Sequence, residues 1–106
     1  MNNTSERRGK PRINCDYPVI AEGFNGDGNK YREKARLANL SASGSYMIIN
    51  RHIGHGHTLS MTIYLAQTLN DEDSPKISTS GTVVRTDNRL DGSFGIAVRF
   101  NSYRFL

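Results

Sequence analysis

The N-terminal segment concentrates arginine side chains at a spacing suited to binding an anion. Residues 1–12 hold four basic side chains against one acidic side chain, a net charge of 4 − 1 = +3 out of +4 for the whole chain. Arg8 and Arg12 form an R-x-x-x-R pattern, and Arg7 precedes it. Guanidinium groups bind phosphate and carboxylate oxygens through paired N–H donors. The pattern therefore indicates an arm for nucleic acid, a nucleotide or an acidic protein surface, with a solvated, disordered tail as the alternative.

A second polar pattern, N-x-S-x-x-G, starts at Asn39 and continues through Ser41 to Gly44. Strand alternation places the side chains of Asn39 and Ser41 on one face, while Leu40 between them points into the core. A glycine at the last position permits a positive φ or a close approach of the backbone to a ligand. The alternative interpretation is that these residues only shape a turn.

No group of residues in the sequence has the composition of a catalytic centre. Catalysis needs a nucleophile beside a base, a pair of carboxylates or an open metal site. The single cysteine, Cys15, has no histidine near it in the sequence. His52, His55 and His57 alternate with glycines as in an exposed turn, so we expect no metal there. The glycine patterns of dinucleotide and P-loop sites are also absent. The sequence thus favours a binding protein without catalytic activity, metal or cofactor.

The elements that must position these residues are all predicted to be β-strands. Leu59, Met61, Ile63 and Leu65 alternate with polar residues and give the clearest strand. The predicted strands are residues 16–23, 31–38, 44–50, 58–65, 77–86 and 93–100. Between them we expect turns at 24–29, a hairpin loop at 51–56, an acidic loop at 70–75 and a turn-rich connection at 87–92.

Short strands of this spacing, with no helical period between them, are typical of an all-β sandwich or barrel. Closing the sheet removes its two exposed edges. We therefore predict a six-stranded antiparallel β-barrel over residues 13–106, with a flexible basic arm over 1–12. One detail conflicts with strict alternation, because the basic residues of the stretch 30–36 fall on the same face as the inward-pointing Leu40. A bulge, or strand ends that project beyond the barrel, would resolve this conflict.

Taken in order, the two polar patterns resemble the signature of the PilZ domain family, R-x-x-x-R followed by [D/N]-x-S-x-x-G. Two later stretches are similar to family strands: Gly81-Thr82-Val83-Val84-Arg85 to G-x-V-V-R, and Gly95-Ile96-Ala97-Val98-Arg99-Phe100 to G-(L/I)-x-V-x-F. The resemblance covers residues 7–100. It implies a six-stranded antiparallel barrel that binds the bacterial second messenger cyclic di-GMP.

The resemblance also implies a ligand site, made of Arg7, Arg8, Arg12, Asn39, Ser41 and Gly44. We expect Arg8 and Arg12 to be its main anchors, because a guanidinium can fork onto a phosphate, pair with O6 and N7 of guanine, or stack on the base. Asn39 can pair with a guanine edge, and Ser41 can donate to a phosphate.

The chain departs from the family pattern in two places. Asn39 stands where Asp is commoner, which we expect to change the affinity or the contact with guanine. The helix that family members usually add after the last strand is absent or truncated, because only residues 101–106 follow it.

The leading hypothesis is a cytoplasmic cyclic di-GMP receptor whose arm orders over the barrel on binding and changes the surface shown to a downstream protein partner. The alternatives are a ligand-independent PilZ-like interaction module and a small nucleic-acid-binding barrel. We expect no nucleic-acid polymer as partner, because the tyrosines are scattered and offer no stacking platform. We expect neither a membrane span nor a secretory signal, and one cysteine fits a reducing cytosol.

Overall fold

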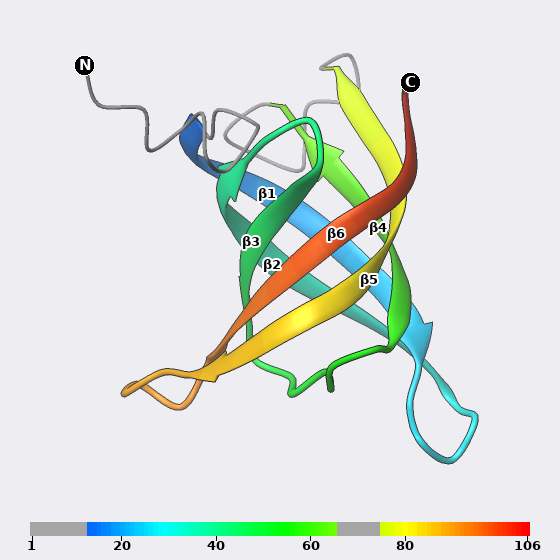
Figure 1. Cartoon of the computed structure of the whole chain (residues 1–106), viewed down its shortest axis with the longest axis vertical. Coiled ribbons are helices and arrows are strands. Elements are labelled where there is room, and N and C mark those ends of the chain that lie inside the picture. Colours follow the sequence, from blue (N-terminus) through cyan, green and yellow to red (C-terminus); the bar gives the residue numbers. More distant parts are fainter. Residues whose placement is uncertain (1–12, 66–74) are drawn as a thin grey trace.

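The computed structural model describes residues 13–65 and 75–106, which form a closed antiparallel barrel with strand order β1-β2-β3-β6-β5-β4 (Figure 1). The strands are β1 (Ile13–Phe24), β2 (Lys30–Leu40), β3 (Gly44–Ile49), β4 (Thr58–Tyr64), β5 (Lys76–Asn88) and β6 (Phe94–Phe105). The predicted all-β class and the six-stranded antiparallel barrel are confirmed. The predicted arm and most of the acidic loop at 70–75 lie outside the described residues.

Alternate residues of the strands point into the barrel and form one apolar core. In β4 the buried positions are Leu59, Met61 and Ile63, as their period of two predicts. The largest side chains with almost no exposed surface are Leu37, Met47, Met61, Ile63, Ile96, Val19 and Val83. Burial of this apolar surface is the main force that closes the sheet on itself.

A bulge in β2 resolves the conflict in alternation between the basic residues of 30–36 and the inward-pointing Leu40. The register between β2 and β3 runs from Leu37↔Met47 to Asn39↔Tyr46, so Ala38 is an extra residue. The basic side chains of 30–36 are exposed, and after the bulge the alternation reverses, which lets Leu40 pack against the core.

The segment between β3 and β4 is not a hairpin loop, which corrects the prediction for 51–56. β3 pairs with β2 and β6, whereas β4 pairs with β1 and β5. The connection therefore crosses one end of the barrel, the lower end in Figure 1. Ile53 in this connection is only 4% exposed and belongs to the core cluster, so it closes that end.

The C-terminal residues continue β6 beyond the predicted end of the strand. β6 pairs with β5 as far as Ile77↔Phe105, after an extra residue at Asn101 shifts the register. Residues 101–105, which lie beyond the predicted last strand, are thus extended. Among residues 13–65 and 75–106 there is no helix long and apolar enough to cross a membrane.

Candidate functional site

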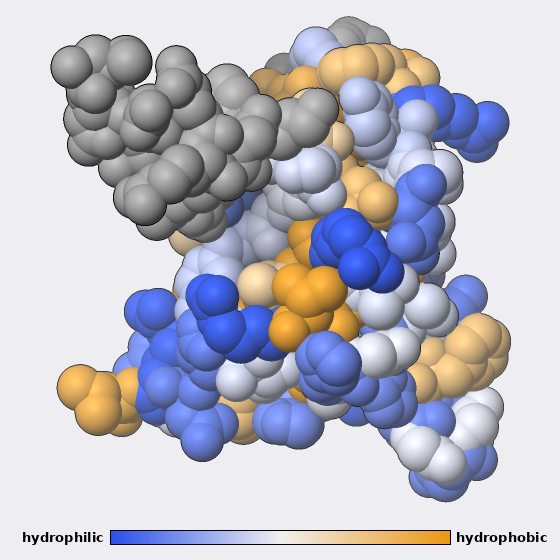
Figure 2. All heavy atoms as spheres, viewed as in Figure 1, coloured by the Kyte–Doolittle hydropathy of each residue, from blue (hydrophilic) through white to orange (hydrophobic). Residues whose placement is uncertain are grey.

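A groove of about 590 Å³ lies where the β2–β3 turn meets the outer faces of β3, β6 and β5. Its lining combines the short polar side chains of the turn with Arg85 and Arg99 and with the apolar Val84 and Ala97. Figure 2 shows an apolar patch near the middle of the β5–β6 face, with strongly hydrophilic side chains on both sides of it. The groove therefore offers positive charge, hydrogen-bonding groups and an apolar surface within one concavity.

The structure brings Asn39, Ser41 and Gly44 together in the lining of this groove. Plain strand alternation does not explain how they meet, because β2 ends at Leu40, before Ser41 and Gly44. Ser41 lies in the turn rather than on the strand. The other predicted site residues, Arg7, Arg8 and Arg12, lie outside the described residues.

Ser41 stabilises the β2–β3 turn as well as lining the groove. Its amide and its hydroxyl donate to the carbonyl of Gly44 at 2.9 and 3.3 Å, and its Oγ accepts from the amide of Ser43 at 3.2 Å. The carbonyl of Ser43 in turn accepts from the amide of Phe100 at 2.8 Å, which ties the turn to β6. The turn-shaping interpretation thus holds for this serine, in a position that also faces the groove.

Gly44 is required by close packing between strands and not by an unusual backbone conformation. Among the described residues, positive φ angles occur at Gly28, Gly56 and Gly92, so the expectation of a positive φ at Gly44 is wrong. A Cβ at Gly44 would collide with the carbonyl oxygen of Val98 on β6. The structure thus shows a close backbone approach of Gly44 to β6.

The two groove arginines were not among the residues predicted to form the site. Arg99 is exposed on β6, and Arg85 is exposed on β5. The β5–β6 register passes from Val83↔Val98 to Arg85↔Ala97, so Val84 is an extra residue in β5. Val83 points inward, while Val84 and Arg85 are both exposed. Bulges often re-aim side chains next to functional sites, and this one turns Arg85 outward into the groove.

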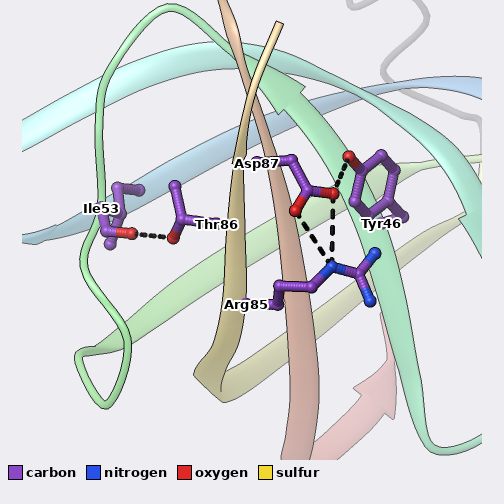
Figure 3. A network of polar contacts seen from close by, with 5 residues as sticks. All are labelled: Tyr46, Ile53, Arg85, Thr86 and Asp87. Carbon is purple, nitrogen blue, oxygen red and sulfur yellow. Dashed lines mark hydrogen bonds and ion pairs between the residues drawn. The ribbon is translucent and has the colours of Figure 1, made fainter.

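Arg85 takes part in a polar network that joins β5 to β3 (Figure 3). Its Nε donates to both carboxylate oxygens of Asp87, at 3.1 and 3.2 Å, and the hydroxyl of Tyr46 donates to Asp87 Oδ2 at 2.8 Å. These hydrogen bonds, from Tyr46 first and then from Arg85, lower the pKa of Asp87 below its usual value. The hydrogen bond to Asp87 also raises the pKa of Arg85, so the guanidinium stays charged.

A larger groove of about 730 Å³ lies against β1, β2, β3 and the β5–β6 connection. Its two basic lining residues, Lys34 and Arg36, are balanced by the carboxylate of Asp16, to which Arg36 donates. Asp91 adds further negative charge to this lining, whereas no carboxylate of the described residues lines the groove of Arg85 and Arg99. An anionic ligand is thus better matched by the groove that holds Arg85 and Arg99.

The histidines and the cysteine show no arrangement suited to catalysis. His52, His55 and His57 are exposed, and His52 packs edge-on against Phe94 with ring centroids 5.3 Å apart. Within the part of the chain that the structure describes, no three His, Cys, Asp or Glu side chains are placed to hold a metal ion. Partial burial raises the pKa of the Cys15 thiol, which disfavours the reactive thiolate.

The closed antiparallel barrel with an arginine-bearing groove on its outer face defines a small β-barrel domain. The family model described as the PilZ domain matches residues 6–104 of the chain. The chain therefore belongs to the PilZ domain family, and the resemblance drawn from its two polar patterns is confirmed.

Three solved structures share the fold. The Bacillus subtilis inhibitor of motility (MotI/DgrA) superposes with a TM-score of 0.68 at 19% identity, over 92% of this chain and 44% of that one. The PilZ domain of YcgR from Escherichia coli, solved with c-di-GMP, superposes with a TM-score of 0.60 at 13% identity, over 91% of this chain and 79% of that one. The MrkH–c-di-GMP complex of K. pneumonia gives 0.61 at 19% identity, over 91% and 45%. This chain thus spans less than half of the MotI/DgrA and MrkH chains. No curated protein sequence matches it.

Proposed function

We propose that this PilZ domain is a cyclic di-GMP receptor without catalytic activity, which binds the ligand in the groove over β3, β6 and β5 and signals to a downstream protein in the bacterial cytoplasm. The observation that carries the proposal is the meeting of Asn39 and Ser41, from the family pattern, with Arg85 and Arg99 in one groove. Two of the structures that share the fold were solved with c-di-GMP.

The chemistry of the groove matches that of the ligand. Cyclic di-GMP carries two phosphate charges and two flat guanine bases, so it needs cations beside an apolar surface. Arg85 and Arg99 supply guanidinium groups that can fork onto phosphate oxygens or onto the O6 and N7 edge of guanine. Val84, which is 41% exposed, offers an apolar surface to the face of a base.

We assign the remaining anchors to the N-terminal arm, through Arg7, Arg8 and Arg12. The pairing of β1 with β2 supports this assignment, because Ile13 lies opposite Leu40 and Asn14 lies opposite Asn39. The chain therefore enters the barrel beside the polar turn, where an arm must start if it is to close over the groove. Ordering the arm would cost conformational entropy, which charge-assisted contacts with the ligand offset.

A calorimetric titration with cyclic di-GMP tests the proposal. We expect wild-type binding, and a loss of affinity of roughly tenfold or more in Arg8→Ala, Arg12→Ala and Arg99→Ala, since a charge-assisted hydrogen bond contributes about 1.5–3 kcal/mol. Lys10→Ala in the arm and Arg104→Ala on β6 are matched controls, because they remove the same charge outside the assigned site. An absence of wild-type binding would favour the ligand-independent interaction module. Unchanged affinity in the Arg8 and Arg12 variants would contradict the role of the arm.

A further inference from the structure

Building on the proposed function, we propose that Asp87 and Tyr46 are positioning residues that hold Arg85 through its Nε, so that its terminal nitrogens can receive a phosphate of the ligand. Neither residue belongs to the two polar patterns of the sequence. Both act on the ligand through Arg85 and are assigned no contact with it.

The contact between Tyr46 and Asp87 crosses a whole strand. Tyr46 on β3 lies opposite Ala97, and Asp87 on β5 lies opposite Gly95, so β6 runs between them. The hydroxyl of Tyr46 nevertheless reaches Asp87, at 2.8 Å. A Cβ at Gly95 would collide with that hydroxyl, so the glycine opens the path for the tyrosine ring. The carboxylate is thereby held in place from a second strand.

The fixed carboxylate then orients Arg85. Both hydrogen bonds from the guanidinium to Asp87 use Nε, so Nη1 and Nη2 are not engaged by this carboxylate, as Figure 3 shows. The guanidinium carbon also lies 5.7 Å from the centroid of the Tyr46 ring, within the range of a cation–π contact. On the inner side of β5, Thr86 Oγ1 donates to the carbonyl of Ile53 at 2.5 Å and anchors the same end of the strand. The side chain and the backbone that carry Arg85 are thus both restrained.

Restraint matters because the side chain of Arg85 is 62% exposed. An unrestrained arginine at this exposure samples many rotamers and loses that freedom on binding, whereas a pre-positioned one loses less. The carboxylate also places a negative charge beside the site of an anionic ligand, and Coulomb repulsion alone would make Asp87 unfavourable. The two effects therefore predict opposite changes in affinity when the charge of Asp87 is removed. Loss of positioning would weaken ligand binding, whereas loss of repulsion would strengthen it.

Affinity measurements on Asp87→Asn show whether the loss of this charge weakens or strengthens ligand binding. We expect the dissociation constant for cyclic di-GMP to rise by about tenfold in Asp87→Asn. We expect a smaller rise in Tyr46→Phe, which keeps the ring and loses only the hydroxyl. The matched control is Asp16→Asn, which removes the same charge from an exposed pair with Arg36 outside the groove and should leave the affinity unchanged. Tighter or unchanged binding in Asp87→Asn would overturn the proposal.

Two further measurements separate positioning from a general effect on the fold. In an Arg85→Ala background, Asp87→Asn should cause no further loss of affinity, and an undiminished loss would overturn the proposal. In the ligand-free domain, the Arg85 Nε–H resonance should be protected from exchange with water in wild type and exposed in Asp87→Asn. A domain that keeps this protection but does not bind cyclic di-GMP would refute the proposed function and leave the positioning supported. An unprotected wild-type resonance would refute the positioning itself.

Discussion

Gly44 and Ser41 show that residues of a binding pattern can also hold the fold. The carbonyl of Gly44 accepts from both the amide and the hydroxyl of Ser41, and the glycine lies against the Val98 carbonyl. Both residues nevertheless line the candidate groove. A loss of ligand binding after substitution of either one would therefore mix a direct effect with an effect on the turn.

Gly44→Ala is expected to lower the free energy of unfolding by about 1–3 kcal/mol, the usual cost of an added group in a packed site. The obstacle is a backbone oxygen of β6, which cannot swing away as a flexible side chain could. Gly26→Ala is the control, because a Cβ there meets nothing within 4 Å and φ is not positive. Urea denaturation of both variants measures the difference. If Gly44→Ala and Gly26→Ala had equal unfolding free energies, β3 and β6 could move apart at Gly44 without cost.

At the scale of single strands, bulges cause most of the errors in predicting from apolar alternation which side chains point into the barrel. Within a strand, apolar alternation is local, so the strands could be predicted from the sequence alone. A bulge is an extra residue relative to a partner strand, so one strand alone reveals it only where its alternation conflicts, as it does between residues 30–36 and Leu40. Counting alternate residues onward from Val83 would place Arg85 inside the barrel, whereas the bulge at Val84 turns it outward. Alternation alone therefore does not place Arg85 in the candidate groove.

The β3–β4 connection was misassigned for a related reason. Its glycines correctly indicate a break in the strands, but strand pairing is a long-range property of the closed barrel. The connection instead crosses the barrel end and inserts Ile53 into the core.

Ile53→Ala is therefore expected to cost about 2–5 kcal/mol of unfolding free energy, the range for truncating a buried isoleucine. A hairpin loop would tolerate the same change almost without effect. Leu90→Ala in the β5–β6 connection is the control, because Leu90 is fully exposed and surface substitutions usually stay within about 0.5 kcal/mol. Thermal or urea unfolding of the two variants gives the comparison. A cost for Ile53→Ala as small as that for Leu90→Ala would argue against a closing role.

Charge is distributed unevenly over the whole molecule. Of the net +4, residues 1–12 contribute +3, so the barrel and its connections are close to neutral. Several charges of the barrel form exposed pairs, among them Arg36 with Asp16 and Arg85 with Asp87. The sequence predicts the family, the barrel and the polar turn. It does not predict which arginines of the barrel line the candidate groove, because that depends on these pairs and on the strand register.

The carboxylates in such contacts make stability depend on pH in a definite direction. Hydrogen bonds from Ser93 lower the pKa of Asp91, and the hydrogen bond from Arg36 lowers that of Asp16. Asp87 is shifted the same way by Tyr46 and Arg85. A carboxyl whose pKa is lower in the folded state binds its proton more weakly there. It therefore stabilises the fold above the ordinary value of 3.8, and this stabilisation is lost as pH falls through the folded pKa.

Asp91→Asn isolates one of these contributions. Asp91 accepts from the hydroxyl and the amide of Ser93, at 2.6 and 2.9 Å. At neutral pH the variant should melt below the wild type, because an amide accepts these bonds less strongly than a carboxylate. As pH falls below 3.8 and then through the lower pKa of the folded state, the wild-type carboxyl becomes protonated, so the gap between the two melting temperatures should close. Ser93→Ala removes the hydroxyl donor. The difference between its melting temperature and that of the wild type should narrow over the same pH range. A gap that stays constant into acid would mean that Asp91 supports the β5–β6 connection through shape and not through charge.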